Sequence, residues 1–138
     1  MGNLDISTSR EWRAIQSLAL IAALYTSVFM LKMGEPDQLS WWLLACVFFV
    51  WLYSPFLLLI IFSMKNKGSI PALRVVFIAM LINSLSGFYL SYEAFIVSKT
   101  DAGGAMFFAV LPMFELVISS IGIAVAMTRA KRPLKKQL

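Results

Sequence analysis

Four long apolar segments dominate the sequence, at about residues 12–33, 39–63, 72–97 and 104–128. Each is close to the roughly 20 residues that an α-helix needs to cross about 30 Å of hydrocarbon. Hydrophobic residues make up 60% of the 138-residue chain, more than a soluble domain of this size buries. We therefore predict an all-α, polytopic membrane protein.

Short polar stretches containing glycine or proline separate the four segments. Turns this short favour helices that pack beside their sequence neighbours in opposite directions, so we expect one domain, an antiparallel bundle of four transmembrane helices. The first segment could instead be a removable secretory signal. Its apolar run is longer than a signal requires and lacks a small-residue cleavage pattern, so we expect it to be retained.

The basic residues predict the orientation. Ten of the 12 Lys and Arg residues lie before or at the start of the first segment, around the turn at 65–74, or in the tail 129–138. Cytoplasmic loops collect positive charge, so both termini are predicted to be cytoplasmic. Attraction to anionic lipid headgroups accounts for the basic tail, and no nucleic-acid partner is expected, because the tail has no interleaved aromatic residues. The short loops and the absence of a glycosylation sequon are compatible with a bacterial inner membrane.

The residue types disfavour catalysis and metal binding. Histidine is absent, and Cys46 is the single cysteine. The chain thus lacks the commonest general base and the commonest metal ligand, and it has no thiol pair. Glu115 has no acidic mate in its segment for paired-carboxylate chemistry. We expect no enzymatic activity, no catalytic residues, no metal site and no cofactor.

Glu115 lies in the middle of the fourth apolar segment. A charged side chain at the centre of a membrane costs about 2.5–3.5 kcal/mol, so we expect Glu115 to face the bundle interior in its neutral form and to share a hydrogen bond with Asn83. Counting 1.5 Å per residue predicts one polar layer at this depth. The intramembrane polar cluster comprises Glu115, Asn83, Tyr25, Thr26, Tyr53, Ser54 and Ser119.

Small residues recur at helical spacing on the third and fourth segments, where they permit close helix approach. The predicted packing positions are Ala79, Gly87, Gly122 and Ala126. Two prolines, Pro55 and Pro112, predict helix kinks, because each frees a carbonyl about four residues earlier, on Trp51 and Phe108. Either kink is a structural bend or a functional hinge.

Two functions fit these features. The first is a non-enzymatic integral membrane protein that acts through helix–helix contacts, as an accessory subunit or an immunity-type protein. Its partners are the lipid bilayer and either another membrane protein or further copies of itself. The alternative is a small oligomeric transporter or channel that uses Glu115 as a protonatable site.

The orientation is testable by cysteine labelling in intact cells, in a Cys46→Ser background. We expect Gly2→Cys and Lys136→Cys to be shielded from a membrane-impermeant thiol reagent, because both positions are predicted to be cytoplasmic. Asp37→Cys and Asp101→Cys should react. Labelling at both termini would contradict the orientation.

Overall fold

The computed structural model describes residues 2–33, 37–93, 96 and 104–130. These residues form four helices: α1 (Gly2–Met33), α2 (Leu39–Lys65), α3 (Ile70–Tyr92) and α4 (Gly104–Ala130). The all-α prediction is therefore confirmed. Each helix contains a stretch long and apolar enough to cross a membrane, namely Ser9–Lys32, Leu39–Lys65, Ile70–Tyr92 and Ala109–Ala130.

The largest differences from the predicted helix boundaries are in α1 and α3. α1 begins at Gly2 rather than near residue 12, because residues 3–11 contain neither glycine nor proline and nothing there interrupts a helix. α3 begins at Ile70, with Pro71 in its first turn, where a missing backbone N–H is tolerated. It ends at Tyr92, before the predicted end at 97, and most of residues 93–97 lies outside the described part of the chain.

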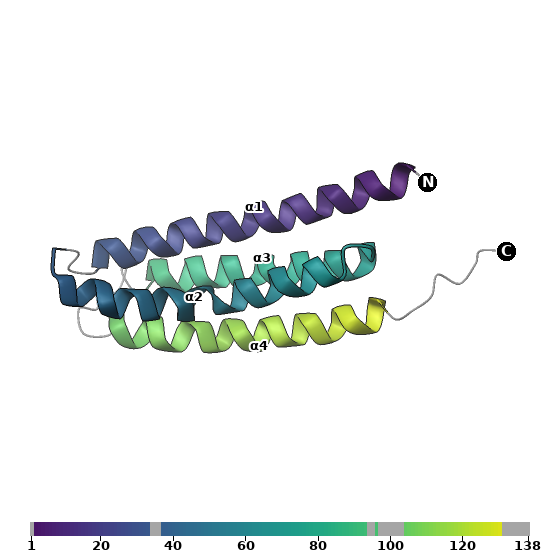
Figure 1. Ribbon diagram of the computed structural model, residues 1–138. Coiled ribbons are helices and arrows are strands. Elements are labelled where there is room, and N and C mark those ends of the chain that lie inside the picture. The colour runs from purple at the N-terminus through teal and green to yellow at the C-terminus, as the bar shows by residue number, and fades with distance from the viewer. Residues whose placement is uncertain (1, 34–36, 94–95, 97–103, 131–138) are drawn as a thin grey trace.

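The chain passes back and forth along one long axis (Figure 1). The N-terminal end of α1, the α2–α3 turn and the C-terminal end of α4 lie together at one end of the molecule. α3 packs mainly against α4, α1 against α3, and α2 against α4. Of the helix pairs that are neighbours in sequence, only α3 and α4 pack closely, which differs from the expectation that every such pair would do so.

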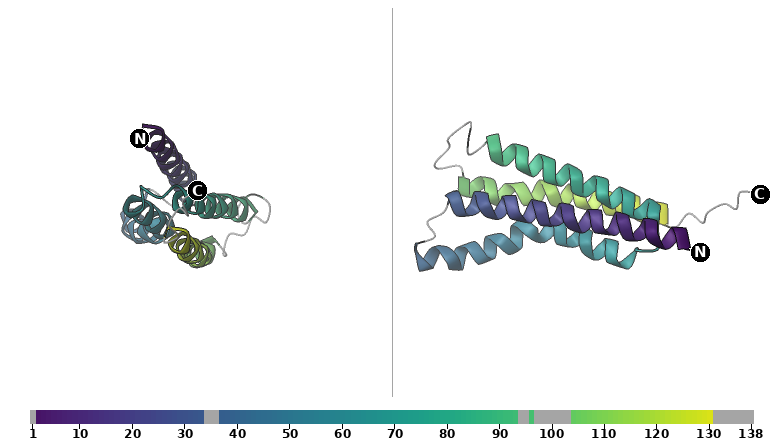
Figure 2. Two further views of the ribbon diagram at one scale, coloured as in Figure 1. Left: turned by 90° about the vertical axis from the view of Figure 1, so that its right-hand side faces the viewer. Right: turned by 90° about the horizontal axis from the view of Figure 1, so that it is seen from above.

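Helix α2 changes direction near its middle (Figure 2). Pro55, which lies inside α2, cannot donate a hydrogen bond to the carbonyl of Trp51. The hydroxyl of Ser54 donates to that carbonyl oxygen instead, at 2.7 Å. A side chain one residue before the proline thus replaces the lost backbone donor.

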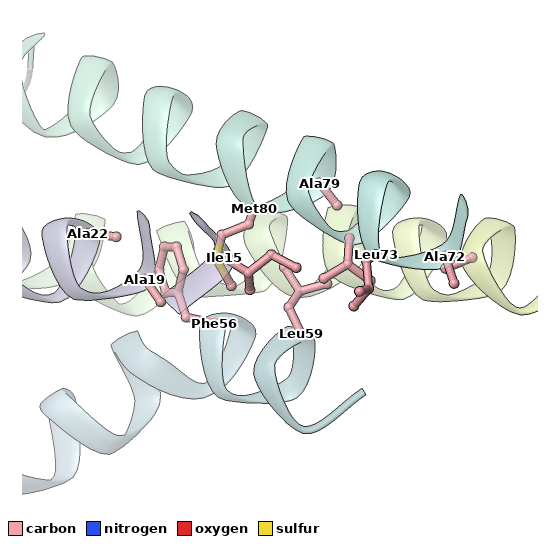
Figure 3. Packing of buried hydrophobic residues seen from close by; sticks show 11 residues of the cluster. Ile15, Ala19, Ala22, Phe56, Leu59, Ala72, Leu73, Ala79 and Met80 are labelled. Atoms are coloured by element: carbon pink, nitrogen blue, oxygen red, sulfur yellow. The ribbon is translucent and has the colours of Figure 1, made fainter. Parts of the chain in front are cut away.

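Two buried apolar clusters fill the space between the helices. In the larger one, Ile15, Leu59 and Met80 point toward one another from three helices (Figure 3). The smaller one comprises Met30, Ala45 and Leu52 from α1 and α2. Small side chains form much of the buried surface, so van der Waals packing between closely spaced backbones holds the helices together.

The outer surface is strongly apolar. Large hydrophobic side chains are among its most exposed, including Leu39 at 80%, Leu43 at 72% and Val50 at 69%. Soluble monomers rarely expose continuous apolar surface on this scale. Acyl chains are the solvent that suits such an exterior.

α3 and α4 approach each other closely at Gly122. A Cβ atom on Gly122 would lie 2.6 Å from the Cβ of Ala79, closer than real Cβ contacts. Because a methyl group on Ala79 cannot rotate away, any side chain at position 122 forces the two helices apart.

The contact between Gly122 and Ala79 predicts that exchanging the two residues restores the stability lost when Gly122 alone is replaced. Gly122→Ala should lower the stability in detergent by about 1–3 kcal/mol, as overpacking does in a tight core. Adding Ala79→Gly should recover most of that loss, since it returns the missing space. Gly68→Ala is the matched control, because nothing lies within 4 Å of a Cβ there. Thermal unfolding of the purified variants measures the effect, and a double variant no more stable than Gly122→Ala would contradict the contact.

Candidate functional site

Glu115 lies on the buried face of α4. Its side chain is 2% exposed, and those of Asn83 and Ser119 are fully buried. Helical spacing produces this face, since positions three or four residues apart share one side of a helix. The whole stripe on α4 that contains Glu115 is buried: Pro112, Glu115, Ser119, Gly122 and Ala126. By contrast, Phe114 and Val117 face outward, at 63% and 58% exposure.

A chain of hydrogen bonds connects three helices through Ser119. The side-chain amide Nδ2 of Asn83, on α3, donates to the hydroxyl Oγ of Ser119 on α4 at 2.8 Å. That hydroxyl donates to the backbone carbonyl of Pro55 on α2 at 3.3 Å. Asn83 Nδ2 also approaches the backbone carbonyl of Glu115, at 3.2 Å. One amide and one hydroxyl therefore link α3, α4 and α2.

Asn83 meets the backbone of Glu115 in this contact, whereas a bond between the two side chains was expected. The Glu115 carboxyl reaches Gly87, one helical turn farther along α3. A Cβ on Gly87 would lie 2.6 Å from the carboxyl oxygen Oε1 and 2.7 Å from the hydroxyl of Tyr25. Glu115 and Tyr25 thus occupy the space that a side chain at position 87 would need.

Tyr25 ties α1 to this region. Its hydroxyl donates to the backbone carbonyl of Ser84 at 3.1 Å, and its ring packs edge-to-face on Phe88 with centroids 5.7 Å apart. The carboxyl of Glu115 and the hydroxyl of Tyr25 therefore reach α3 from opposite neighbours, α4 and α1. Of the predicted polar cluster, Tyr25, Asn83, Glu115 and Ser119 therefore lie together, and Ser84 joins them through its backbone carbonyl.

The other predicted members of the polar layer bond elsewhere. Thr26 donates to the carbonyl of Ala22 in its own helix at 2.8 Å, and Ser54 donates to Trp51 as described above. Tyr53 joins Ser27 through their hydroxyl groups at 2.5 Å, which links α1 to α2. Sequence reasoning identified Tyr53 but missed Ser27, whose only signal was a hydroxyl in an apolar segment.

The part of α4 around Pro112, the second predicted kink, also bonds across the bundle. The indole Nε1 of Trp51, on α2, donates to the carbonyl of Ala109 on α4 at 3.0 Å. Ala109 lies three residues before Pro112, so this contact and the Ser119–Pro55 bond hold α2 against α4 on both sides of Pro112.

Two buried polar atoms have no hydrogen-bond partner among the described residues, Asn83 Oδ1 and Ser84 Oγ. Such atoms usually bond to an ordered water or a ligand, since an unpaired buried acceptor or hydroxyl is costly. Asn83 Oδ1 offers an acceptor, and Ser84 Oγ a donor and an acceptor. In the same described ranges, no group of three or more His, Cys, Asp or Glu side chains is arranged to hold a metal ion.

Comparison with known proteins adds no assignment: no family model matches the chain, and no curated protein or solved structure is significantly similar to it.

The geometry predicts energetic coupling between Asn83 and Ser119. Asn83→Leu and Ser119→Ala should be non-additive in detergent stability, with a coupling of about 0.5–2 kcal/mol, the range for interhelical hydrogen bonds. Asn83→Leu combined with Thr26→Val is the control, and it should be additive, because Thr26 bonds within its own helix. Chemical unfolding of the single and double variants gives both values. Additivity in the Asn83–Ser119 pair would contradict the hydrogen bond.

Proposed function

We propose that this chain is an integral, multi-pass protein of a bacterial inner membrane, folded as an antiparallel four-helix bundle with both termini in the cytoplasm. Two observations support the proposal. The exterior of the helices is apolar, and the first residues of α1, the α2–α3 turn and the end of α4 share one end of the molecule (Figure 1). Ten of the 12 basic residues fall in or next to these segments in the sequence.

Its function is non-enzymatic: it binds other membrane helices, as an accessory subunit or an immunity-type protein. The observation that carries this proposal is the hydrogen-bond chain from Asn83 through Ser119 to the carbonyl of Pro55. These polar groups form hydrogen bonds between helices of the chain itself. In this role Glu115 is a structural clasp whose carboxyl fills the space beside Gly87.

The exposed faces are then the binding surface. α1 and α2 pack less closely with one another than either packs with its main partner, and both direct large apolar side chains outward. A partner helix competes there only with lipid, so shape and close packing decide the affinity.

A small oligomeric transporter or channel is the second candidate. The observation in its favour is that Asn83 Oδ1 and Ser84 Oγ, both buried near Glu115, have no partner in the described residues. A carboxyl next to unpaired polar atoms resembles the intramembrane sites that bind cations or relay protons. Four helices enclose little space, so this function would require several copies of the chain.

Purification in mild detergent, with variants of Glu115, distinguishes the two functions. We expect the wild-type chain to co-purify with a membrane protein in a fixed ratio. Glu115→Gln should keep this partner and the thermal stability, because glutamine preserves the size and the hydrogen-bonding groups of a neutral glutamic acid. Glu115→Ala should lose stability, because it leaves a cavity at a buried position beside Gly87.

A transporter requires a group that gains and loses a proton, which glutamine cannot do. Recovery of the chain as a homo-oligomer alone, together with a folded Glu115→Gln variant that has lost its activity in cells, would contradict the clasp and support transport.

A further inference from the structure

Among the described residues, the end of the molecule that carries the first residues of α1 and the α2–α3 turn is strongly basic (Figure 1). Its exposed cationic side chains, which we call the basic end, are Arg10, Arg13, Lys65, Lys67, Arg74 and Arg129. The described charged side chains toward the other end are Lys32, Asp37 and Glu93, where the signs are mixed. The positive charge is therefore concentrated at one end.

Two of these cations converge on one turn of α1. The ammonium group of Lys67 lies over the ring of Trp12, 4.6 Å from its centroid. The guanidinium Nε of Arg74 lies 3.2 Å from the carboxylate Oε1 of Glu11. Glu11 and Trp12 are consecutive in α1, with Cα atoms about 3.8 Å apart, so Lys67 and Arg74 contact neighbouring residues of the same helical turn.

The charges at this place do not balance. Glu11 is the one acidic side chain in contact with the pair among the described residues, and it contacts Arg74 through Nε, leaving two further guanidinium nitrogens. The Arg74 side chain is 67% exposed, and Lys67 is also exposed. Arg74 lies just after the first turn of α3, and that first turn has no acidic residue. The site therefore has one net positive charge, accessible donors and an adjacent indole.

We propose that Lys67 and Arg74, together with Trp12, form a binding site for the headgroup of an anionic phospholipid. A phosphodiester supplies the missing negative charge and accepts hydrogen bonds from both cations. Trp12 lies near the start of Ser9–Lys32, the apolar stretch of α1, and tryptophan rings at such positions favour the headgroup region of a bilayer. A lipid fits better than a soluble anion, because its acyl chains continue along the apolar faces of α1 and α3, where Leu20 and Ile78 are exposed.

The test is binding of phosphatidylglycerol to the full-length chain in a neutral detergent, followed by native mass spectrometry and by the shift in melting temperature. We expect phosphatidylglycerol to bind and stabilise, and phosphatidylcholine and inorganic phosphate to do neither. Lys67→Gln and Arg74→Gln should each weaken binding about fivefold, the factor expected for one cation at an anionic surface. Glu11→Gln should bind at least as tightly as wild type, because it frees Arg74.

A charge-matched control separates a local site from diffuse attraction. Arg13→Gln with Arg129→Gln removes two charges from the same end, but Arg13 lies about 200° around α1 from Glu11, which Arg74 contacts, and Arg129 lies in the last turn of α4. This double variant should keep most of the binding, while Lys67→Gln with Arg74→Gln should lose it. All these positions are exposed, so folding should persist, as the unchanged melting temperature without lipid will verify. Equal losses in the two double variants, or stabilisation by inorganic phosphate alone, would overturn the proposal.

Discussion

The two hydrogen bonds donated by Asn83 hold α3 against α4, and the remaining contacts are arranged around that pair. An amide N–H left unpaired in an apolar interior is costly, and the partners of Asn83 Nδ2 come from the neighbouring helix α4. A bond of 2.8 Å to Ser119 requires the helices to be close. The missing side chain at Gly122, which faces Ala79, provides that closeness. Polar pairing and small-residue packing therefore depend on each other.

The outer helices are attached to this central pair in different ways. α1 is joined to α3 by the Tyr25 hydroxyl and by the alanines of the larger buried cluster. α2 is joined to α4 through backbone carbonyls, those of Pro55 and Ala109, which accept bonds from Ser119 and Trp51. The carbonyl of Pro55, near which α2 bends (Figure 2), is part of the interface between α2 and α4. α1 and α2 meet mainly through the Ser27–Tyr53 contact and the smaller cluster.

The sequence predicted the features that depend on the helical period and on the rise of a helix per residue. Helical spacing identified the buried stripe of α4, and counting residues brought Asn83, Tyr25 and Glu115 to one depth, where they do lie close together. The sequence could not predict how far each helix turns about its own axis, or which helices pack against each other. Whether Asn83 meets the carboxyl or the carbonyl of Glu115 depends on how far each helix turns about its axis. Hydropathy also fails to predict that α1 packs on α3 rather than on α2, because both alternatives bury apolar surface.

The packing of α1 on α3 and of α2 on α4 affects how the chain assembles during synthesis. Tyr25 and its acceptor Ser84 are 59 residues apart, and Ser119 and Pro55 are 64 apart. At a translation rate of about 5–20 residues per second, the second residue of each pair is synthesised roughly 3–13 seconds after the first. α1 therefore lacks its main contacts until α3 is made, and the hydrogen-bond chain from Asn83 through Ser119 to Pro55 forms only after α4 is made. A chain that stops before α4 leaves the side-chain amide of Asn83 and the carbonyl of Pro55 without their Ser119 partner.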